Sequence, residues 1–180
     1  MNRRTVLKHM VTVATAPLLL AACGRASASN SPAKASGDGG PGIERLEKPL
    51  AEWQKLLPAN AYSVLFEEDT ERPFSSPLND EHRAGAFICA ACALPLFASS
   101  TKFDSGTGWP SFYESLPNRV STKEDRSLLM SRTEYHCSRC GGHQGHVFDD
   151  GPAPTGKRYC NNGLALQFVP EGQTLPALRS

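Results

Sequence analysis

The sequence lacks a strong charge of either sign. Its 180 residues carry 19 Lys and Arg against 18 Asp and Glu, a formal net charge of +1. Five of the basic residues but only one acidic residue lie within the first 42 positions, so the remainder holds 14 basic and 17 acidic residues, a net charge of −3. A weakly acidic domain offers neither the basic surface that binds nucleic acid nor the one that binds anionic lipid. We therefore expect no nucleic-acid partner.

The N-terminal apolar stretch is too short to cross a membrane. Val11–Ala22 falls below the roughly 20 residues that a spanning helix needs. A basic start before a short apolar stretch predicts a secretory signal over residues 1–22. The run Arg3–Lys8 (RRTVLK) resembles a twin-arginine signal, which exports folded proteins. An ordinary signal for unfolded export is the alternative.

A flexible tether is expected after the signal. Leu20–Cys23 (LAAC) resembles a lipobox, which predicts a lipid anchor on Cys23, whereas Ala26–Ala28 offers a rival cleavage site that would release a soluble product. Residues 23–42 are rich in Ser, Ala, Gly and Pro and cannot bury enough apolar surface to fold. The folded domain is expected over residues 43–180, in an exported, periplasmic, membrane-anchored lipoprotein.

The domain lacks long uninterrupted elements and internal repeats. Ile43–Leu57 has helix-like apolar spacing, interrupted by Pro49 and stopped by Pro58, and predicts one or two short helical turns. Gly and Pro then recur every few residues between short runs with strand character. Such runs predict a mainly β domain of antiparallel sheets. The predicted strands are Gly85–Cys89, Ser127–Tyr135, Gly145–Phe148 and Leu164–Val169, with a loose tail over Glu171–Ser180.

Four of the six cysteines form two C-x-x-C pairs. Cys89 and Cys92 make the first pair, and Cys137 and Cys140 make the second. Two such knuckles supply the four thiolates of a tetrahedral zinc site, and a site without an open position is structural. Two disulfides in an oxidising compartment, an iron site, and a thioredoxin-like redox pair are the alternatives.

Cys160 stands apart from these pairs, within Lys157–Gly163 (KRYCNNG). An extended run would place Arg158, Cys160 and Asn162 on one face. A nearby cation favours the thiolate, the nucleophilic form, and an asparagine amide can hydrogen-bond a substrate. A buried, inert cysteine is the alternative.

Histidines and a tryptophan extend this candidate site. His143 and His146 can act as acids, bases or donors near neutral pH, although a metal pair or exposed histidines would look the same in the sequence. Asp150 follows them in a turn-like run. Trp109, between Gly108 and Pro110, offers an aromatic wall or a core residue.

Together these residues make the domain resemble the B-type methionine sulfoxide reductases, the family that acts on the R epimer. The resemblance covers roughly residues 62–169. The matching runs are Thr70–Phe74 (TERPF), Cys89–Cys92, Lys102–Phe112 (KFDSGTGWPSF), Cys137–Phe148 and Arg158–Asn162 (RYCNN).

The resemblance implies a fold, a chemistry and a set of roles. The fold would be two antiparallel sheets, a β-tent, with structural Zn2+ remote from the catalytic centre. Cys160 would be the nucleophile that becomes a sulfenic acid, and Trp109 would pack against the substrate's S-methyl group. His143 and His146 would be the active-site histidines, supported by Asn162, Arg158 and Asp150. The substrate would be methionine sulfoxide in proteins or peptides.

Two positions depart from the family pattern. Thr107 stands where many members carry a resolving cysteine, so an outside thiol, from a thioredoxin-like donor or a small molecule, is expected to reduce Cys160. Gly163 replaces a common serine, which is expected to be tolerated. The chain is expected to act as a monomer. A non-enzymatic zinc module that binds a ligand or peptide, or a rubredoxin-like electron carrier, would explain the four cysteines equally well.

Overall fold

The computed structural model describes residues 42–125 and 131–180. The predicted signal and most of the predicted tether, with Cys23, lie outside these residues, and so does the first part of the predicted strand Ser127–Tyr135. No helix among the described residues is long and apolar enough to span a membrane.

Two short helices open the domain, each directly after a proline. α1 spans Leu50–Leu56 after Pro49, and α2 spans Ala59–Glu67 after Pro58. Proline fixes a backbone angle suited to a helix start but cannot continue a helix that precedes it. Pro58 therefore ends the predicted helical segment and also starts α2, a helix that the sequence analysis missed.

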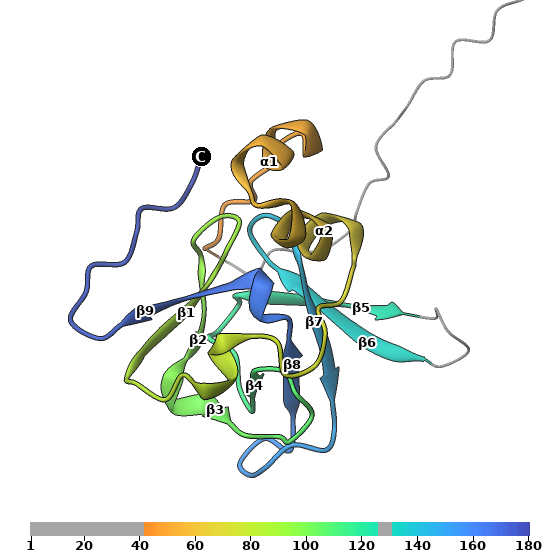
Figure 1. Cartoon of the computed structure of the whole chain (residues 1–180), viewed down its shortest axis with the longest axis vertical. Coiled ribbons are helices and arrows are strands. Elements are labelled where there is room, and N and C mark those ends of the chain that lie inside the picture. Colours follow the sequence, from red (N-terminus) through yellow and green to blue (C-terminus); the bar gives the residue numbers. More distant parts are fainter. Residues whose placement is uncertain (1–41, 126–130) are drawn as a thin grey trace, which may run out of the picture. The chain divides into compact units, whose positions relative to one another are not determined.

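Nine strands among the described residues form two antiparallel sheets, which confirms the predicted fold class (Figure 1). The smaller sheet has the order β2-β1-β9 and the larger one the order β3-β4-β8-β7-β6-β5. The strands are β1 (Gly85–Cys89), β2 (Pro95–Ala98), β3 (Lys102–Phe103), β4 (Ser111–Phe112), β5 (Val120–Asp125), β6 (Arg132–Cys137), β7 (His143–Phe148), β8 (Arg158–Asn161) and β9 (Leu166–Pro170). In the described part of the chain, 3-10 turns lie at η1 (Pro77–Asp80), η2 (Ser99–Thr101) and η4 (Gly163–Ala165).

The core between the two sheets is aromatic. Phe97 of β2 stacks on Phe112 of β4, with ring centroids 4.2 Å apart, and Phe87 of β1 meets the same ring at 4.9 Å. Tyr135 of β6 meets Phe97 edge-on, and all four rings are fully buried. Aromatic pairs of this kind add to the stability gained from burial. They join both sheets and so fix the larger sheet, which carries the candidate site.

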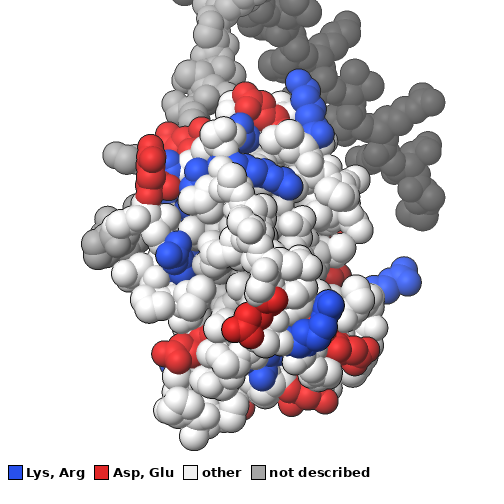
Figure 2. Space-filling view, turned by 90° about the vertical axis from the view of Figure 1, so that its left-hand side faces the viewer, with Lys and Arg blue, Asp and Glu red and all other residues white. Residues whose placement is uncertain are grey.

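The tail is better anchored than predicted. Glu171–Ser180 has no helix or strand, but the Arg179 amide donates to the carbonyl of Cys92, and its own carbonyl accepts from Arg139 at 2.6 Å. The expectation of a loose tail is therefore wrong near its end. On the face drawn in Figure 2, basic and acidic side chains are interspersed, as the near-zero net charge predicts.

Candidate active site

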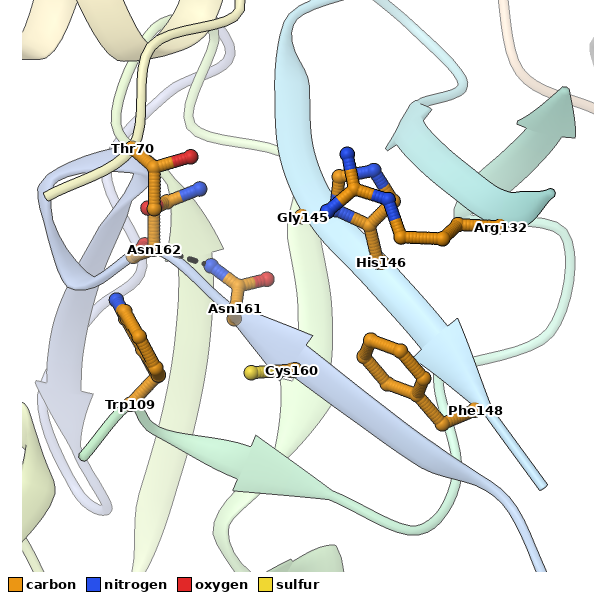
Figure 3. A pocket seen from close by; sticks show the side chains of 9 residues that line it. All are labelled: Thr70, Trp109, Arg132, Gly145, His146, Phe148, Cys160, Asn161 and Asn162. Carbon is orange, nitrogen blue, oxygen red and sulfur yellow. Dashed lines mark hydrogen bonds between the residues drawn. The ribbon is translucent and has the colours of Figure 1, made fainter. Parts of the chain in front are cut away.

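A pocket of about 140 Å3 opens on the larger sheet at Cys160 (Figure 3). It brings together four predicted site residues, Cys160, Asn162, His146 and Trp109. The predicted residues His143, Arg158 and Asp150 do not line it and lie behind its walls. Its lining consists of Thr70, Trp109, Arg132, Gly145, His146, Phe148, Cys160, Asn161 and Asn162.

Cys160 sits on a strand with neighbours on both sides. In β8 it pairs with Ser111 of β4 and with His146 of β7. Gly145 allows the close approach on the β7 side, because a Cβ atom there would lie 2.0 Å from the carbonyl oxygen of Cys160. The sequence therefore places the thiol on a rigid element rather than on a loop.

The pKa of Cys160 reflects opposing influences. Burial raises the pKa of the thiol above its usual value, while the Arg158 guanidinium and a hydrogen bond from the Thr107 hydroxyl act to lower it. Arg158 acts in the direction predicted from the sequence, but burial outweighs it. Without a bound substrate, the thiol form of Cys160 therefore predominates at neutral pH.

Trp109 forms a wall of the pocket and is held from behind by Glu71. Its indole Nε1 donates to the carbonyl oxygen of Glu71 at 3.2 Å. The Glu71 amide donates to Asn162 Oδ1 at 3.2 Å, and its buried carboxylate accepts from the amides of Gly163 and Leu164. Glu71 thus ties two pocket residues together. The sequence analysis quoted it only as part of the run Thr70–Phe74.

The two predicted histidines occupy different positions. His146 lines the pocket, with Nε2 3.0 Å from Asp125 Oδ2, and burial lowers its pKa. His143 is almost fully buried, with its ring centroid 5.7 Å from that of His146 and its Nε2 3.5 Å from Asn162 Nδ2. His146 can therefore face a substrate directly, whereas His143 lies behind the pocket wall.

Asp150 and Arg158 form a pair outside the pocket. Two hydrogen bonds of 2.8 Å join the carboxylate to the guanidinium and hold the pKa of Asp150 below its usual value. The guanidinium also lies 4.3 Å from the centre of the Phe148 ring, which lines the pocket. The pair therefore supports Phe148 and places a cation near Cys160.

Several pocket and supporting residues were missed by the sequence analysis. Arg132 lines the pocket and pairs with Asp125 at 2.7 Å, and Tyr135 donates to Asn161 Oδ1 at 2.6 Å. Arg132 and Glu134 alternate along β6, directly before the histidines. Charged residues at every second position, next to the aromatic core residue Tyr135, were the sequence signal that could have indicated a strand with a charged face toward the site.

The four paired cysteines meet at a second centre. Their sulfur atoms all lie within 4.8 Å of one another, with 3.7 Å between Cys89 and Cys140 and 3.5 Å between Cys92 and Cys137. The two knuckles have matching backbone hydrogen bonds: the amides of Ala93 and Gly141 donate to the carbonyls of Cys89 and Cys137. None of these cysteines lines the pocket.

The thiols fit one metal ion better than two disulfides. All five cysteines of the described part of the chain are free, and the sulfur–sulfur contacts of 3.5 and 3.7 Å each join one knuckle to the other. Sulfur atoms placed about 2.3 Å from a tetrahedral ion lie roughly 3.8 Å apart, close to the spacing seen. Contacts with the other thiols raise the pKa of Cys89 and lower that of Cys92, and a bound cation would stabilise several thiolates together.

Comparison with known proteins identifies the family. A SelR domain matches residues 57–170. The chain is 55% identical to the peptide methionine sulfoxide reductase MsrB of Methanosarcina barkeri over 127 residues, which are 70% of this chain and 89% of the relative. It is 50% identical to the MsrB of Leifsonia xyli over 138 residues, 76% of this chain and 99% of the relative. The chain therefore belongs to the SelR-domain family of B-type methionine sulfoxide reductases.

Proposed function

We propose that this chain reduces the R epimer of methionine sulfoxide in peptides and proteins, and so repairs oxidised proteins. The observation that carries the proposal is the Cys160 thiol in a pocket walled by Trp109, His146 and Asn162. The relatives named above are peptide methionine sulfoxide reductases, and the SelR match includes all four residues. An oxidoreductase with a thiol nucleophile accounts for them together.

The pocket offers a different surface to each substituent of the sulfoxide sulfur. Trp109 provides an apolar wall for the S-methyl group, and His146 and Arg132 provide a polar wall for the oxygen on the other side of Cys160 (Figure 3). The rest of the substrate chain would leave through the opening. Methionine sulfoxide is chiral at sulfur, so a site with three distinct surfaces accepts one epimer. The family resemblance indicates that this is the R epimer.

The proposed first step oxidises Cys160. Its thiolate sulfur attacks the sulfoxide sulfur while the sulfoxide oxygen takes up a proton. The S–O bond to the substrate breaks, the hydroxyl group is transferred to Cys160 Sγ, and methionine leaves. The substrate gains the two electrons that Cys160 loses, which gives a sulfenic acid. The proton comes from the Cys160 thiol, and His146, directly or through water, is positioned to pass it to the sulfoxide oxygen.

The proposed second step needs an outside thiol. Thr107, not a cysteine, contacts Cys160, and the other four described thiols belong to the metal centre. A thiol of a thioredoxin-like donor or a small molecule would attack the sulfenic acid sulfur and release water. A second thiol would then release Cys160 and form the donor's disulfide.

We propose that the four-cysteine centre holds one Zn2+ as a structural ion. The cation would stabilise four thiolates and fix the two knuckles that end β1 and β6. The rubredoxin-like alternative predicts bound iron and therefore a coloured protein. Metal analysis of the purified chain distinguishes these two ions.

Export, lipidation and a monomeric state also remain proposals. Export and lipidation rest on residues 1–42, on the resemblance of Arg3–Lys8 to a twin-arginine signal and of Leu20–Cys23 to a lipobox. Mass spectrometry of the N-terminus of the exported protein tests them: a lipid on Cys23 supports the anchor, and a chain beginning at Ser29 contradicts it. Light scattering tests the monomer.

The direct test is an assay with separated R and S epimers of a methionine sulfoxide peptide. We expect turnover of the R epimer only, and a loss of at least about 1,000-fold in kcat for Cys160→Ser, because a hydroxyl replaces the thiol nucleophile. Full turnover by that variant would exclude Cys160 as the nucleophile, whereas a parent protein without turnover of either epimer would favour the binding-module alternative. Equal metal content and unfolding temperature of variant and parent show that the fold is unchanged.

The second test is a single turnover of the domain without Cys23 and without reductant. Mass spectrometry should find one added oxygen or its trapped adduct. A loss of two hydrogens would show an internal disulfide instead, and the assignment of the other thiols to the metal would then be wrong.

A further inference from the structure

The strand next to the histidines carries a buried carboxylate that the proposed mechanism does not use. Glu134 of β6 is only 2% exposed, and its Oε1 lies 2.6 Å from His143 Nδ1. On the basis of the proposed function, we propose that Glu134 is a positioning residue: it holds His143 in one tautomer, with a bare Nε2 that braces Asn162 at the pocket wall.

The carboxylate must accept the hydrogen bond. Burial favours a raised pKa for Glu134, but hydrogen bonds from His136, His143 and Lys123 outweigh it and hold the pKa well below its usual value. An ionised carboxylate has no hydrogen to donate. His143 therefore carries its proton on Nδ1, the nitrogen that faces Glu134.

The opposite side of the His143 ring leads independently to the same tautomer. Asn162 Oδ1 accepts from the amide of Glu71, and Asn162 Nδ2 donates to the carbonyl of Gln144 at 3.2 Å. The Glu71 amide needs an acceptor and the Gln144 carbonyl needs a donor, so together they fix the positions of the oxygen and the nitrogen of the Asn162 side-chain amide. That nitrogen lies 3.5 Å from His143 Nε2, so a donor faces Nε2 and Nε2 is the acceptor.

The chain of contacts runs from the middle of the sheet to the pocket. Glu134 lies opposite His146 in the β6–β7 ladder and opposite Lys123 in the β5–β6 ladder. Strands on both sides fix its backbone, and Asn162 at the other end of the chain lines the pocket beside Cys160. A histidine held in this way can take up or release a proton only at Nε2, since its other nitrogen is occupied by the carboxylate.

The same cluster does not need a metal ion. Glu134, His136 and His143 could offer three ligands, but His136 Nε2 already lies 2.7 Å from Glu134 Oε1, and the Lys123 ammonium lies 2.9 Å from Oε2. Each carboxylate oxygen therefore has partners, and a cation is already present. A hydrogen-bonded network accounts for all three side chains.

The first measurement needs no variant. The 15N chemical shifts of the ring nitrogens of His143, in the metal-loaded protein at neutral pH, should show a protonated Nδ1 and a bare Nε2. A protonated Nε2 with a bare Nδ1 would overturn the proposal.

The second measurement compares variants. Glu134→Leu cannot accept a hydrogen bond, so we expect mixed His143 tautomers and a fall of about 100-fold in kcat with little change in KM. Lys123→Met and His136→Gln remove the other two partners of the carboxylate and serve as controls, with kcat within about threefold of the parent. In the double variant Lys123→Met/Glu134→Gln, the Lys123 ammonium no longer donates to the side chain at position 134. The glutamine can then turn its amide oxygen toward His143 Nδ1. Compared with Glu134→Leu, this double variant should restore the single His143 tautomer and most of kcat.

Two results would contradict the proposal. One is an unchanged kcat in Glu134→Leu when its His143 tautomers are mixed. The other is a loss in the Glu134→Gln double variant as large as in Glu134→Leu, which would indicate a need for the charge rather than for positioning. Failure of the proposed function is a separate outcome, because it would appear as an inactive parent protein.

Discussion

At the scale of single residues, the chemistry depends on a thiol in an unfavourable setting. Cys160 is largely buried, and burial outweighs the influence of the nearby guanidinium of Arg158 on its pKa. The proposed nucleophile is therefore mostly protonated at neutral pH. This arrangement also limits reactions with other oxidants, since the thiolate is the reactive form.

The pKa of Cys160 leads to a prediction about alkylation. The rate of reaction with iodoacetamide should keep rising with pH beyond the usual pKa of a cysteine, near about 8.5, because the thiolate fraction grows until the raised pKa is passed. In Arg158→Met the cation is lost, so the rise should shift to still higher pH. Mass spectrometry of the Cys160 peptide measures both rates. A plateau below pH 8 in the parent protein would contradict this account.

At the scale of elements, the turn η4 is shaped by a glycine that the sequence analysis treated as a tolerated replacement. A Cβ atom on Gly163 would lie 1.9 Å from Ser76 Oγ and 2.5 Å from Ser76 Cβ. Ser76, which caps η1, thus occupies the space that a side chain at position 163 would need. The absence of a side chain also leaves room for the Glu71 carboxylate to accept from the amide of Gly163.

The contact between Gly163 and Ser76 predicts that a substitution at one position lowers the free energy of unfolding and that a second substitution at the other position restores it. Gly163→Ala should lower the free energy of unfolding by about 1–3 kcal/mol, because the added methyl group overlaps Ser76. Ser76→Gly should cost less than that and should recover most of the loss when combined with Gly163→Ala. Urea unfolding of the four proteins gives the coupling energy. Additive effects of the two changes would show that the overlap relaxes elsewhere.

The sequence predicted the elements unevenly. β1 was predicted with its bounds, Gly85–Cys89, because a short apolar run without polar residues ends at a C-x-x-C knuckle. α2 was missed because its neighbour Pro58 was interpreted only as a stop signal. β5 was missed because it is largely exposed and polar, so no apolar alternation marks it. Its role depends on partners in β6, which only the folded ladder reveals.

The site was predictable where chemistry marks the residue type. Cys160, His146 and Trp109 were predicted as site residues because cysteine, histidine and tryptophan have distinctive chemistry. The structure brings these three side chains together in one pocket. Glu134 and Glu71 were not singled out, because a glutamate in a sequence is usually a solvated surface residue. Their importance comes from burial and from partners far along the chain, such as Asn162 for Glu71.

At the scale of the whole molecule, Gln144 connects the metal centre to the pocket. Its side chain donates to Cys89 Sγ at 3.6 Å, and its backbone carbonyl accepts from both the amide and the side chain of Asn162. The two centres are separate in space but share this one residue. Changes at the knuckles can therefore reach the pocket wall.

Metal removal should accordingly affect both stability and activity. Chelation of the proposed zinc ion, or Cys92→Ser, should lower the unfolding temperature by more than about 10 °C, because several kcal/mol of binding free energy would stabilise only the folded state. Gln144→Leu keeps the four thiols, so its metal content should match that of the parent while kcat falls through the loss of the contact to Cys89. Atomic absorption, thermal unfolding and kcat measured on one preparation check this. Full stability of the metal-free chain would contradict a structural ion.

The position of Cys160 in β8 also determines how accessible its side chain is between the two proposed steps. Hydrogen bonds to β4 and β7 hold β8 along both edges, so its amides can open to solvent only when much of the sheet separates. The sulfenic acid that we propose would thus be held on a strand that is bonded along both edges. Brief local unfolding would not uncover it, and the donor would reach it only through the pocket by which methionine leaves.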